Sequence, residues 1–112
     1  MKYYLEIENE EHMLNAYELA SCYHIYSNKN KPHARFVARL LTEYKKALNY
    51  EEKFYYKTKK GDMMQVYPSY IYRPLLDKLI EDYPPNREIS MVFDNKTHYF
   101  TIKEGQFKGD DN

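Results

Sequence analysis

The chain has no tryptophan, a single cysteine and only three glycines in 112 residues. Because Cys22 stands alone, no disulfide can form within the chain, and a reducing cytoplasm is the compartment we expect. Three glycines cannot supply a G-x-G-x-x-G motif or a Walker A loop, which excludes the common nucleotide-binding loops. No stretch approaches the ~20 apolar residues of a membrane-spanning helix, and early acidic residues are atypical of a signal peptide.

The sequence also lacks the residue spacings of common catalytic and metal sites. The metal candidates are His12, Cys22, His24 and His33. No second cysteine or H-E-x-x-H spacing accompanies them, so we predict neither a metal nor a cofactor. Cys22 lies on a predicted helix, where a lone cysteine is more often a small buried residue than a nucleophile. Adjacent acidic pairs diverge on a helix or strand and form no catalytic dyad. We therefore predict that the protein is not an enzyme.

Tyrosine is what the chain has in excess, with fourteen residues. A tyrosine ring has a large apolar body and one polar tip, which suits sheet faces, groove walls and contact surfaces. The usage of Lys, Asn, Tyr, Ile and Glu indicates an AT-rich genome, such as that of a low-GC bacterium or its phage. The formal net charge is zero, yet residues 28–60 carry ten Lys or Arg against three Glu. A partner would therefore meet a local basic surface on a neutral protein.

Hydrophobic periodicity predicts an α+β fold with the order β-α-α-ββ-α-ββ. The expected elements are a strand over 2–8, a helix from an Asn9 cap to about residue 25, a helix over 32–49, a hairpin of 53–59 with 63–67, a helix with Pro74 in its first turn that stops at Tyr83, and a hairpin of 88–93 with 97–103. Hairpins require antiparallel pairing, so we predict an antiparallel sheet of about five strands with three helices packed on one face. We expect one domain over 1–103 and a flexible polar tail over 104–112.

The register of the second hairpin follows from its turn. If Asn95-Lys96 forms a two-residue loop, Ile89 pairs with Ile102 and Met91 with Phe100 on one face of the sheet. Asparagine tolerates the left-handed backbone that such a turn requires, although lysine is a weaker second residue than glycine.

The second predicted helix has a basic side. Its apolar residues cluster on one face, and cationic residues cluster on the opposite face over ~22 Å. Together with the first hairpin, they predict a surface for nucleic acid or a phosphorylated ligand, formed by Lys29, Lys31, Arg35, Arg39, Lys46, Lys57 and Lys59. The alternative is that these are solvated faces of an amphipathic helix and a lysine-protected hairpin.

A tyrosine-rich segment between the first hairpin and the third helix predicts a second contact surface. It comprises Tyr67, Tyr70, Tyr72 and Arg73, the residue types that are enriched at protein contacts. The alternative is a satellite cluster that packs under a loop.

These observations lead to two hypotheses about function. The first is a small binding protein, encoded by a phage or mobile element, that acts as an accessory protein or inhibitor by stoichiometric contact with a protein partner. The second is binding of nucleic acid or a phosphorylated ligand through the basic residues. We expect no membrane association, and self-association is a further use for the tyrosine-rich surface. A hydrolase or transferase is the least favoured class.

Overall fold

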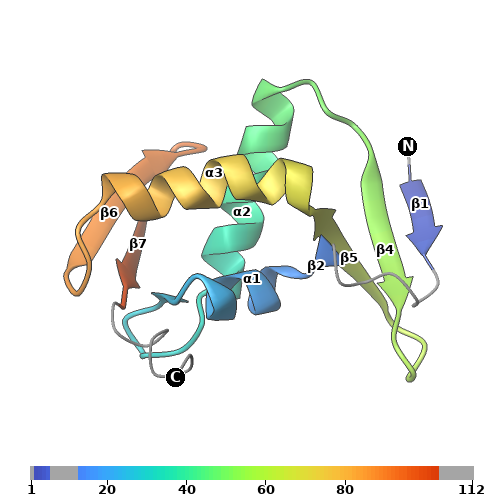
Figure 1. The fold of residues 1–112 in the computed structure, drawn as a ribbon, viewed down its shortest axis with the longest axis horizontal. Coiled ribbons are helices and arrows are strands. Elements are labelled where there is room, and N and C mark those ends of the chain that lie inside the picture. Colours follow the sequence, from blue (N-terminus) through green and yellow to red (C-terminus); the bar gives the residue numbers. More distant parts are fainter. Residues whose placement is uncertain (1, 6–12, 104–112) are drawn as a thin grey trace.

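The computed structural model of the protein describes residues 2–5 and 13–103 (Figure 1). These residues form seven strands and three helices. The strands are β1 (Lys2–Leu5), β2 (Met13–Leu14), β3 (Ile25–Tyr26), β4 (Lys53–Lys57), β5 (Met63–Pro68), β6 (Glu88–Phe93) and β7 (Lys96–Ile102). The helices are α1 (Ala16–Cys22), α2 (Ala34–Ala47) and α3 (Ser69–Asp82). The tail that we predicted over 104–112 lies outside the described residues.

The described strands form two sheets. The first has the order β1-β4-β5-β2 and the second the order β3-β7-β6. The α+β class is confirmed, whereas the expected single sheet of about five strands is wrong. Figure 1 shows α2 and α3 crossing between the two sheets, so the helices do not all cover one face of one sheet. β1 pairs with β4 in parallel. The connection between them contains α1 and α2 and is long enough for a parallel pair, whereas strands joined by a tight turn must pair antiparallel.

The first helix is shorter than the sequence predicted. Met13 and Leu14 pair with β5 as strand β2, and Asn15 then caps α1. The Asn15 side chain accepts a hydrogen bond from the Glu18 N–H at 2.8 Å, and the Glu18 carboxylate accepts one from the Asn15 N–H at 2.9 Å. This capping box satisfies two N–H groups that a helix start leaves unpaired, and it fixes the start of α1. The expected cap, Asn9, lies outside the described residues.

The second helix agrees with its prediction within two residues at each end. Its buried face includes Phe36, Val37 and Leu41, none of them more than 1% exposed. The Leu48 N–H donates to the Tyr44 carbonyl at 3.1 Å. Asn49 follows with a φ of 57°, the left-handed conformation that commonly ends a helix.

The third helix begins earlier than predicted, at Ser69, so Pro74 lies inside it. Proline removes one backbone hydrogen bond, and this cost usually limits it to a first turn. The burial of Ile71 and Leu76 on either side of Pro74 gives the longer helix an apolar face that offsets the missing bond.

The second hairpin turns at Asp94 and Asn95, whose φ values are 55° and 58°. These are the left-handed angles of a type I′ turn, which Asp and Asn adopt more readily than Lys. The turn therefore lies one residue earlier than predicted, and Ile89 pairs with Phe100 and Met91 with His98. Pairing has moved by two residues along β7, so each side chain keeps its predicted face.

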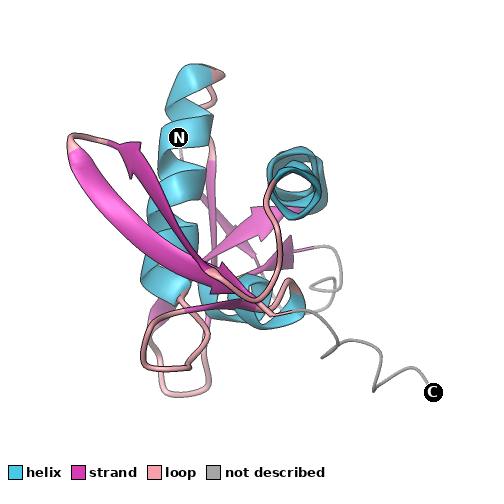
Figure 2. Cartoon of the chain, turned by 90° about the vertical axis from the view of Figure 1, so that its left-hand side faces the viewer, coloured by secondary structure: helices cyan, strands magenta, loops and turns pink. Residues whose placement is uncertain are grey.

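The core joins the second sheet to the helices. The rings of Phe36 on α2 and Phe100 on β7 stack with centroids 4.5 Å apart, and Figure 2 shows the β6–β7 hairpin in front of α2. Leu19, Ile25 and Leu76 extend the same cluster to α1, β3 and α3, and all three are 0% exposed. On the opposite side of α2, Arg35, Thr42 and Lys46 remain exposed.

Candidate functional site

The outer side of α2 carries four polar residues in one row. Arg35, Arg39, Thr42 and Lys46 follow one another at spacings of four, three and four, so on a helix they lie within an arc of about 60°. The apolar residues Phe36, Val37 and Leu41 occupy the remaining directions and are buried. Local sequence alone therefore directs the row away from the core.

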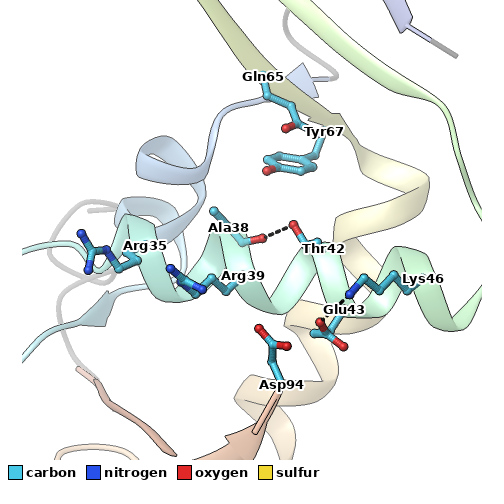
Figure 3. A pocket seen from close by; sticks show the side chains of 9 residues that line it. All are labelled: Arg35, Ala38, Arg39, Thr42, Glu43, Lys46, Gln65, Tyr67 and Asp94. Atoms are coloured by element: carbon cyan, nitrogen blue, oxygen red, sulfur yellow. Dashed lines mark hydrogen bonds and ion pairs between the residues drawn. The ribbon is translucent and has the colours of Figure 1, made fainter. Parts of the chain in front are cut away.

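This row forms the floor of a groove of about 350 Å³ (Figure 3). Gln65 and Tyr67 of β5 stand on one side of the groove, and Asp94 of the β6–β7 turn stands on the other. We call this site the basic groove. Its full lining is Arg35, Ala38, Arg39, Thr42, Glu43, Lys46, Gln65, Tyr67 and Asp94.

The charges in the basic groove are mixed. Lys46 makes an ion pair with Glu43, with Nζ and Oε2 3.2 Å apart. In the part of the chain that the structure describes, neither Arg35 nor Arg39 makes an ion pair. Asp94 lies beside the row (Figure 3) and forms no ion pair with either arginine. The two guanidinium groups are therefore available to an incoming anion.

The remaining polar groups of the groove are neutral. The Thr42 hydroxyl donates to the Ala38 carbonyl at 2.8 Å, which leaves its oxygen able to accept a further hydrogen bond. The Gln65 amide can both donate and accept. The groove thus presents two arginines, the Lys46–Glu43 ion pair, and the neutral side chains of Thr42 and Gln65.

Tyr67 lies at the border between the groove and the core. Its side chain is only 3% exposed, and burial, with the nearby Tyr55 hydroxyl, raises the pKa of Tyr67 to about 12. The Lys45 Nζ lies 5.5 Å from the Tyr67 ring centroid, within the range of a cation–π contact. Burial lowers the pKa of Lys45, and the Lys53 charge adds to this effect.

The predicted tyrosine-rich contact surface does not form as expected. Tyr67 and Tyr72 are 3% and 6% exposed, so they belong to the core, whereas Tyr70 is 61% exposed. The reason is that Tyr70 and Tyr72 lie on α3, where residues two apart point about 200° away from each other. Only Tyr70 and the exposed Arg73 remain on the surface. The Tyr70 and Tyr50 hydroxyl oxygens are 2.9 Å apart, which fixes the Tyr70 ring.

The predicted anion-binding residues fall into three places. Arg35, Arg39 and Lys46 meet in the basic groove. The other four are exposed and do not line it: Lys29 and Lys31 lie in the loop before α2, and Lys57 and Lys59 lie at the end of the β4–β5 hairpin. The structure therefore supports one compact cationic site in place of a continuous surface of seven residues.

Sequence reasoning missed Gln65, Asp94 and Glu43 as lining residues. Glu43 was accessible from the sequence, since it lies three residues before Lys46 on the same helix. Gln65 and Asp94 had no such signal, because they reach the groove only through the packing of β5 and the β6–β7 turn beside α2 (Figure 3).

Within residues 2–5 and 13–103, no three His, Cys, Asp or Glu side chains gather closely enough to hold a metal ion. Over the same residues, no helix combines the length and the hydrophobicity that spanning a membrane requires. Comparison with protein-family models, with curated proteins and with solved structures gives no match. The basic groove is therefore the feature on which a functional proposal rests.

Proposed function

We propose that the protein acts by binding rather than by catalysis, and that its basic groove receives an acidic segment of a protein partner. The observation that carries this proposal is the pair of arginines, Arg35 and Arg39, that share one groove without an ion pair among the described residues. Arginine presents a planar set of N–H donors that matches a carboxylate, and it is enriched at protein contacts.

The mixed charge of the groove favours a protein segment over a long polyanion. Glu43 and Asp94 line the groove together with Arg35, Arg39 and Lys46. Two carboxylates repel a chain of phosphates, whereas a peptide with acidic and basic or polar side chains can match both signs. The groove volume of about 350 Å³ accommodates a few side chains, which is the scale of an anchoring site rather than of a whole interface.

The biological setting belongs to the same proposal. A stoichiometric binding protein fits an accessory or inhibitory role in the cytoplasm. The residue usage favours an AT-rich genome, such as that of a low-GC bacterium or its phage, as the source. These suggestions rest on composition and on the lone Cys22.

The test is a charge reversal with a matched control. The partner would be captured from a host lysate by immobilised protein, identified by mass spectrometry and then purified. Arg35→Glu combined with Arg39→Glu should weaken binding to the purified partner by about a hundredfold or more, since each charged contact contributes about 1.5–3 kcal/mol.

The control is Lys57→Glu combined with Lys59→Glu, which changes the net charge equally on residues outside the groove. Retained binding in the control together with loss in the groove variant supports the proposal. Equal loss in both variants would indicate non-specific electrostatic attraction, and retention in both would place the contact surface elsewhere.

A second candidate function is nucleic-acid binding through the same groove. It is favoured by the spacing of the cations: Lys46 lies eleven positions after Arg35, or roughly 17 Å along the helix at 1.5 Å per residue. That length spans two or three phosphates, and the exposed Lys29 and Lys31 precede the helix start. Glu43 and Asp94 oppose it.

The two functions differ in their salt dependence. Fluorescence anisotropy with a labelled, mixed-sequence single-stranded DNA should detect binding at about 50 mM salt and lose most of it at about 200 mM if phosphates are contacted. The Arg35→Glu, Arg39→Glu variant should remove this signal. No binding at the lower salt concentration would eliminate the nucleic-acid candidate.

A further inference from the structure

Among the residues that the structure describes, strand β6 forms an edge of the second sheet. In the order β3-β7-β6 it has one neighbour, β7, and it runs over six residues, Glu88–Phe93. Natural edges are usually protected by shortness, by lysine, by proline or by a bulge. β6 has no lysine, proline or bulge, because its sequence is EISMVF and its pairing with β7 is unbroken, and its one charged residue is Glu88 at the start of the strand. By contrast, the edge strands β2 and β3 have two residues each.

The turn geometry defines which backbone groups of β6 point outward. In a hairpin with a two-residue turn, the residues that flank the turn form a hydrogen-bonded pair, and such pairs recur at every second residue. Phe93 and Lys96 flank this turn. Phe93, Met91 and Ile89 therefore direct their N–H and C=O groups to β7, and Val92, Ser90 and Glu88 direct theirs away from the sheet.

We infer that β6 binds β6 of a second copy of the chain, antiparallel, with a two-fold axis at Ser90. This pairing gives a continuous six-stranded sheet with the order β3-β7-β6-β6-β7-β3. The net charge of zero means that two copies approach each other without long-range repulsion. The inference concerns a surface other than the basic groove and does not depend on the proposed function.

The choice of register follows from the side-chain faces. Ile89 and Met91 point to the helices, and the exposed Ser90 and Val92 point to solvent. Strands that keep matching faces and pair their outward backbone groups must place an even-numbered residue opposite an even-numbered residue. A two-fold axis at Ser90 does this, with Ser90 opposite its own copy and Glu88 opposite Val92 of the other chain.

The neighbouring register is less favourable. A two-fold axis at Met91 places Glu88 opposite Asp94 of the second copy, and symmetry produces this contact twice. Like charges directly opposite each other destabilise a strand pair. The axis at Ser90 avoids them and still pairs the five residues from Glu88 to Val92.

Apolar surface lies on both sides of the edge. On the outer side, Val92 is 71% exposed and Tyr99 on the adjacent strand is 52% exposed. On the inner side, Met91 contributes to a hollow of about 490 Å³ that is otherwise lined by α2, α3 and Tyr83, with Leu40, Leu75 and Leu79 among its apolar residues. Because Met91 belongs to the edge strand, the hollow adjoins the position that Ile89 and Met91 of the second copy would occupy. An added strand would therefore cover apolar surface as well as backbone groups.

Analytical ultracentrifugation of the full chain over a range of concentrations tests the inference. The wild-type protein should show a monomer–dimer equilibrium with twice the monomer mass at high concentration. Ser90→Pro should raise the dissociation constant by about tenfold or more, since the central pair loses two backbone hydrogen bonds. The Ser90 N–H points away from β7, so an edge proline at this position leaves the hairpin pairing intact.

A charge pair at the same position makes the test specific for the axis. Ser90→Lys and Ser90→Asp should each weaken self-association about fivefold, because like charges meet at the two-fold axis. An equimolar mixture of the two variants should recover association as a heterodimer. Thr97→Lys, which adds the same charge on the already paired strand β7, should remain a dimer. Unchanged circular dichroism would establish that each variant folds.

Three results would overturn the inference. A wild-type chain that stays monomeric at about millimolar concentration shows that the edge does not pair. Charge variants that both dimerise as strongly as the wild-type protein show that another surface is used. Charge variants that associate more weakly alone and no more strongly when mixed show that the two-fold axis does not lie at Ser90.

Discussion

At the scale of the single residue, Phe36 connects α2 to the second sheet. Its side chain is 1% exposed and stacks on Phe100, with Phe93 and His98 also within ring-contact range. Phe36→Ala would remove this contact and leave a cavity, so we expect a loss of about 3–5 kcal/mol in the free energy of unfolding. Urea denaturation followed by circular dichroism measures it.

The matched control is Tyr17→Ala on α1, where the side chain is 58% exposed. We expect a change within about 0.5 kcal/mol, because little packing is removed. A similar loss in both variants would mean that α2 does not pack on the second sheet through Phe36.

His33 gives the fold a dependence on acid. Burial lowers its pKa from 6.5, while its hydrogen bond to the Tyr99 backbone acts in the opposite direction, and the charges of His98 and Arg35 lower it further. The folded state therefore binds this proton less readily than the unfolded state. The stability that neutral His33 contributes should be fully present above about pH 6.5. It should be lost as the pH falls from that value through the lowered pKa of the folded state.

The slope that one such proton adds is at most about 1.4 kcal/mol per pH unit. His33→Gln should reduce the pH dependence of the free energy of unfolding between about pH 6.5 and the lowered pKa. Urea denaturation of both proteins at several pH values compares the slopes. Parallel curves would show that protonation of His33 is not linked to folding.

Sequence reasoning at the residue scale succeeded where position depends on local spacing. Arg35, Arg39 and Lys46 share one face because a helix repeats every 3.6 residues, and the groove collects all three. The prediction for Tyr72 was wrong, because the segment is helical and Tyr72 lies on the buried side of α3. Asp94 was inaccessible, since it comes from a turn more than fifty residues beyond Arg39 in the chain.

At the scale of the element, the β6–β7 turn illustrates how one residue sets a register. Asp94 and Asn95 both have positive φ, and the second position of a type I′ turn strongly favours glycine. Asn95→Gly should therefore raise the free energy of unfolding by about 0.5–1 kcal/mol. Asn95→Ala should lower it by about 1 kcal/mol, because alanine lacks the polar side chain that tolerates left-handed backbone.

Thermal denaturation of both variants gives the sign directly. Lys96→Gly is the informative control, since the sequence alone placed residue 96 in the turn and the structure places it in β7. Glycine in a strand destabilises it, so a stabilised Lys96→Gly protein would contradict the observed turn.

The same hairpin shows why the faces of a strand are easier to predict than its partners. Alternation of apolar and polar residues determines the face, and a shift of two residues preserves it. The pairing itself depends on which two residues accept left-handed backbone, a difference of about 1–2 kcal/mol per residue. The helical spacing of α2 left less freedom, and its limits were predicted within two residues.

At the scale of the whole molecule, the division into two sheets could not be read from the sequence. Both hairpins were predictable from their turns. No local sequence pattern, however, determines whether two hairpins join edge to edge or lie on opposite sides of a helix. The two-residue strands β2 and β3 are also too short to leave a periodic pattern, although each completes one sheet.

This arrangement predicts unequal stability across the molecule. Residues 53–64 of the β4–β5 hairpin include no buried side chain. Among the described residues, the hairpin's member of the core cluster is Tyr67, at the end of β5. Figure 1 shows this hairpin extending away from α2 and α3. Backbone hydrogen bonds with little buried apolar surface open locally, at a free energy below that of global unfolding. Amides from 53–64 should therefore exchange faster than those around Phe36 and Phe100.

Hydrogen exchange followed by mass spectrometry, repeated at low concentrations of denaturant, distinguishes the two kinds of opening. Exchange in peptides around Phe36 and Phe100 should accelerate steeply with denaturant, because global unfolding exposes much surface, whereas exchange in 53–64 should respond weakly. Phe36→Ala should then accelerate exchange around Phe100 strongly and leave 53–64 nearly unchanged. Equal protection and equal denaturant slopes in both regions would mean that the two sheets unfold as one cooperative unit, in which the hairpin is stabilised as firmly as the core.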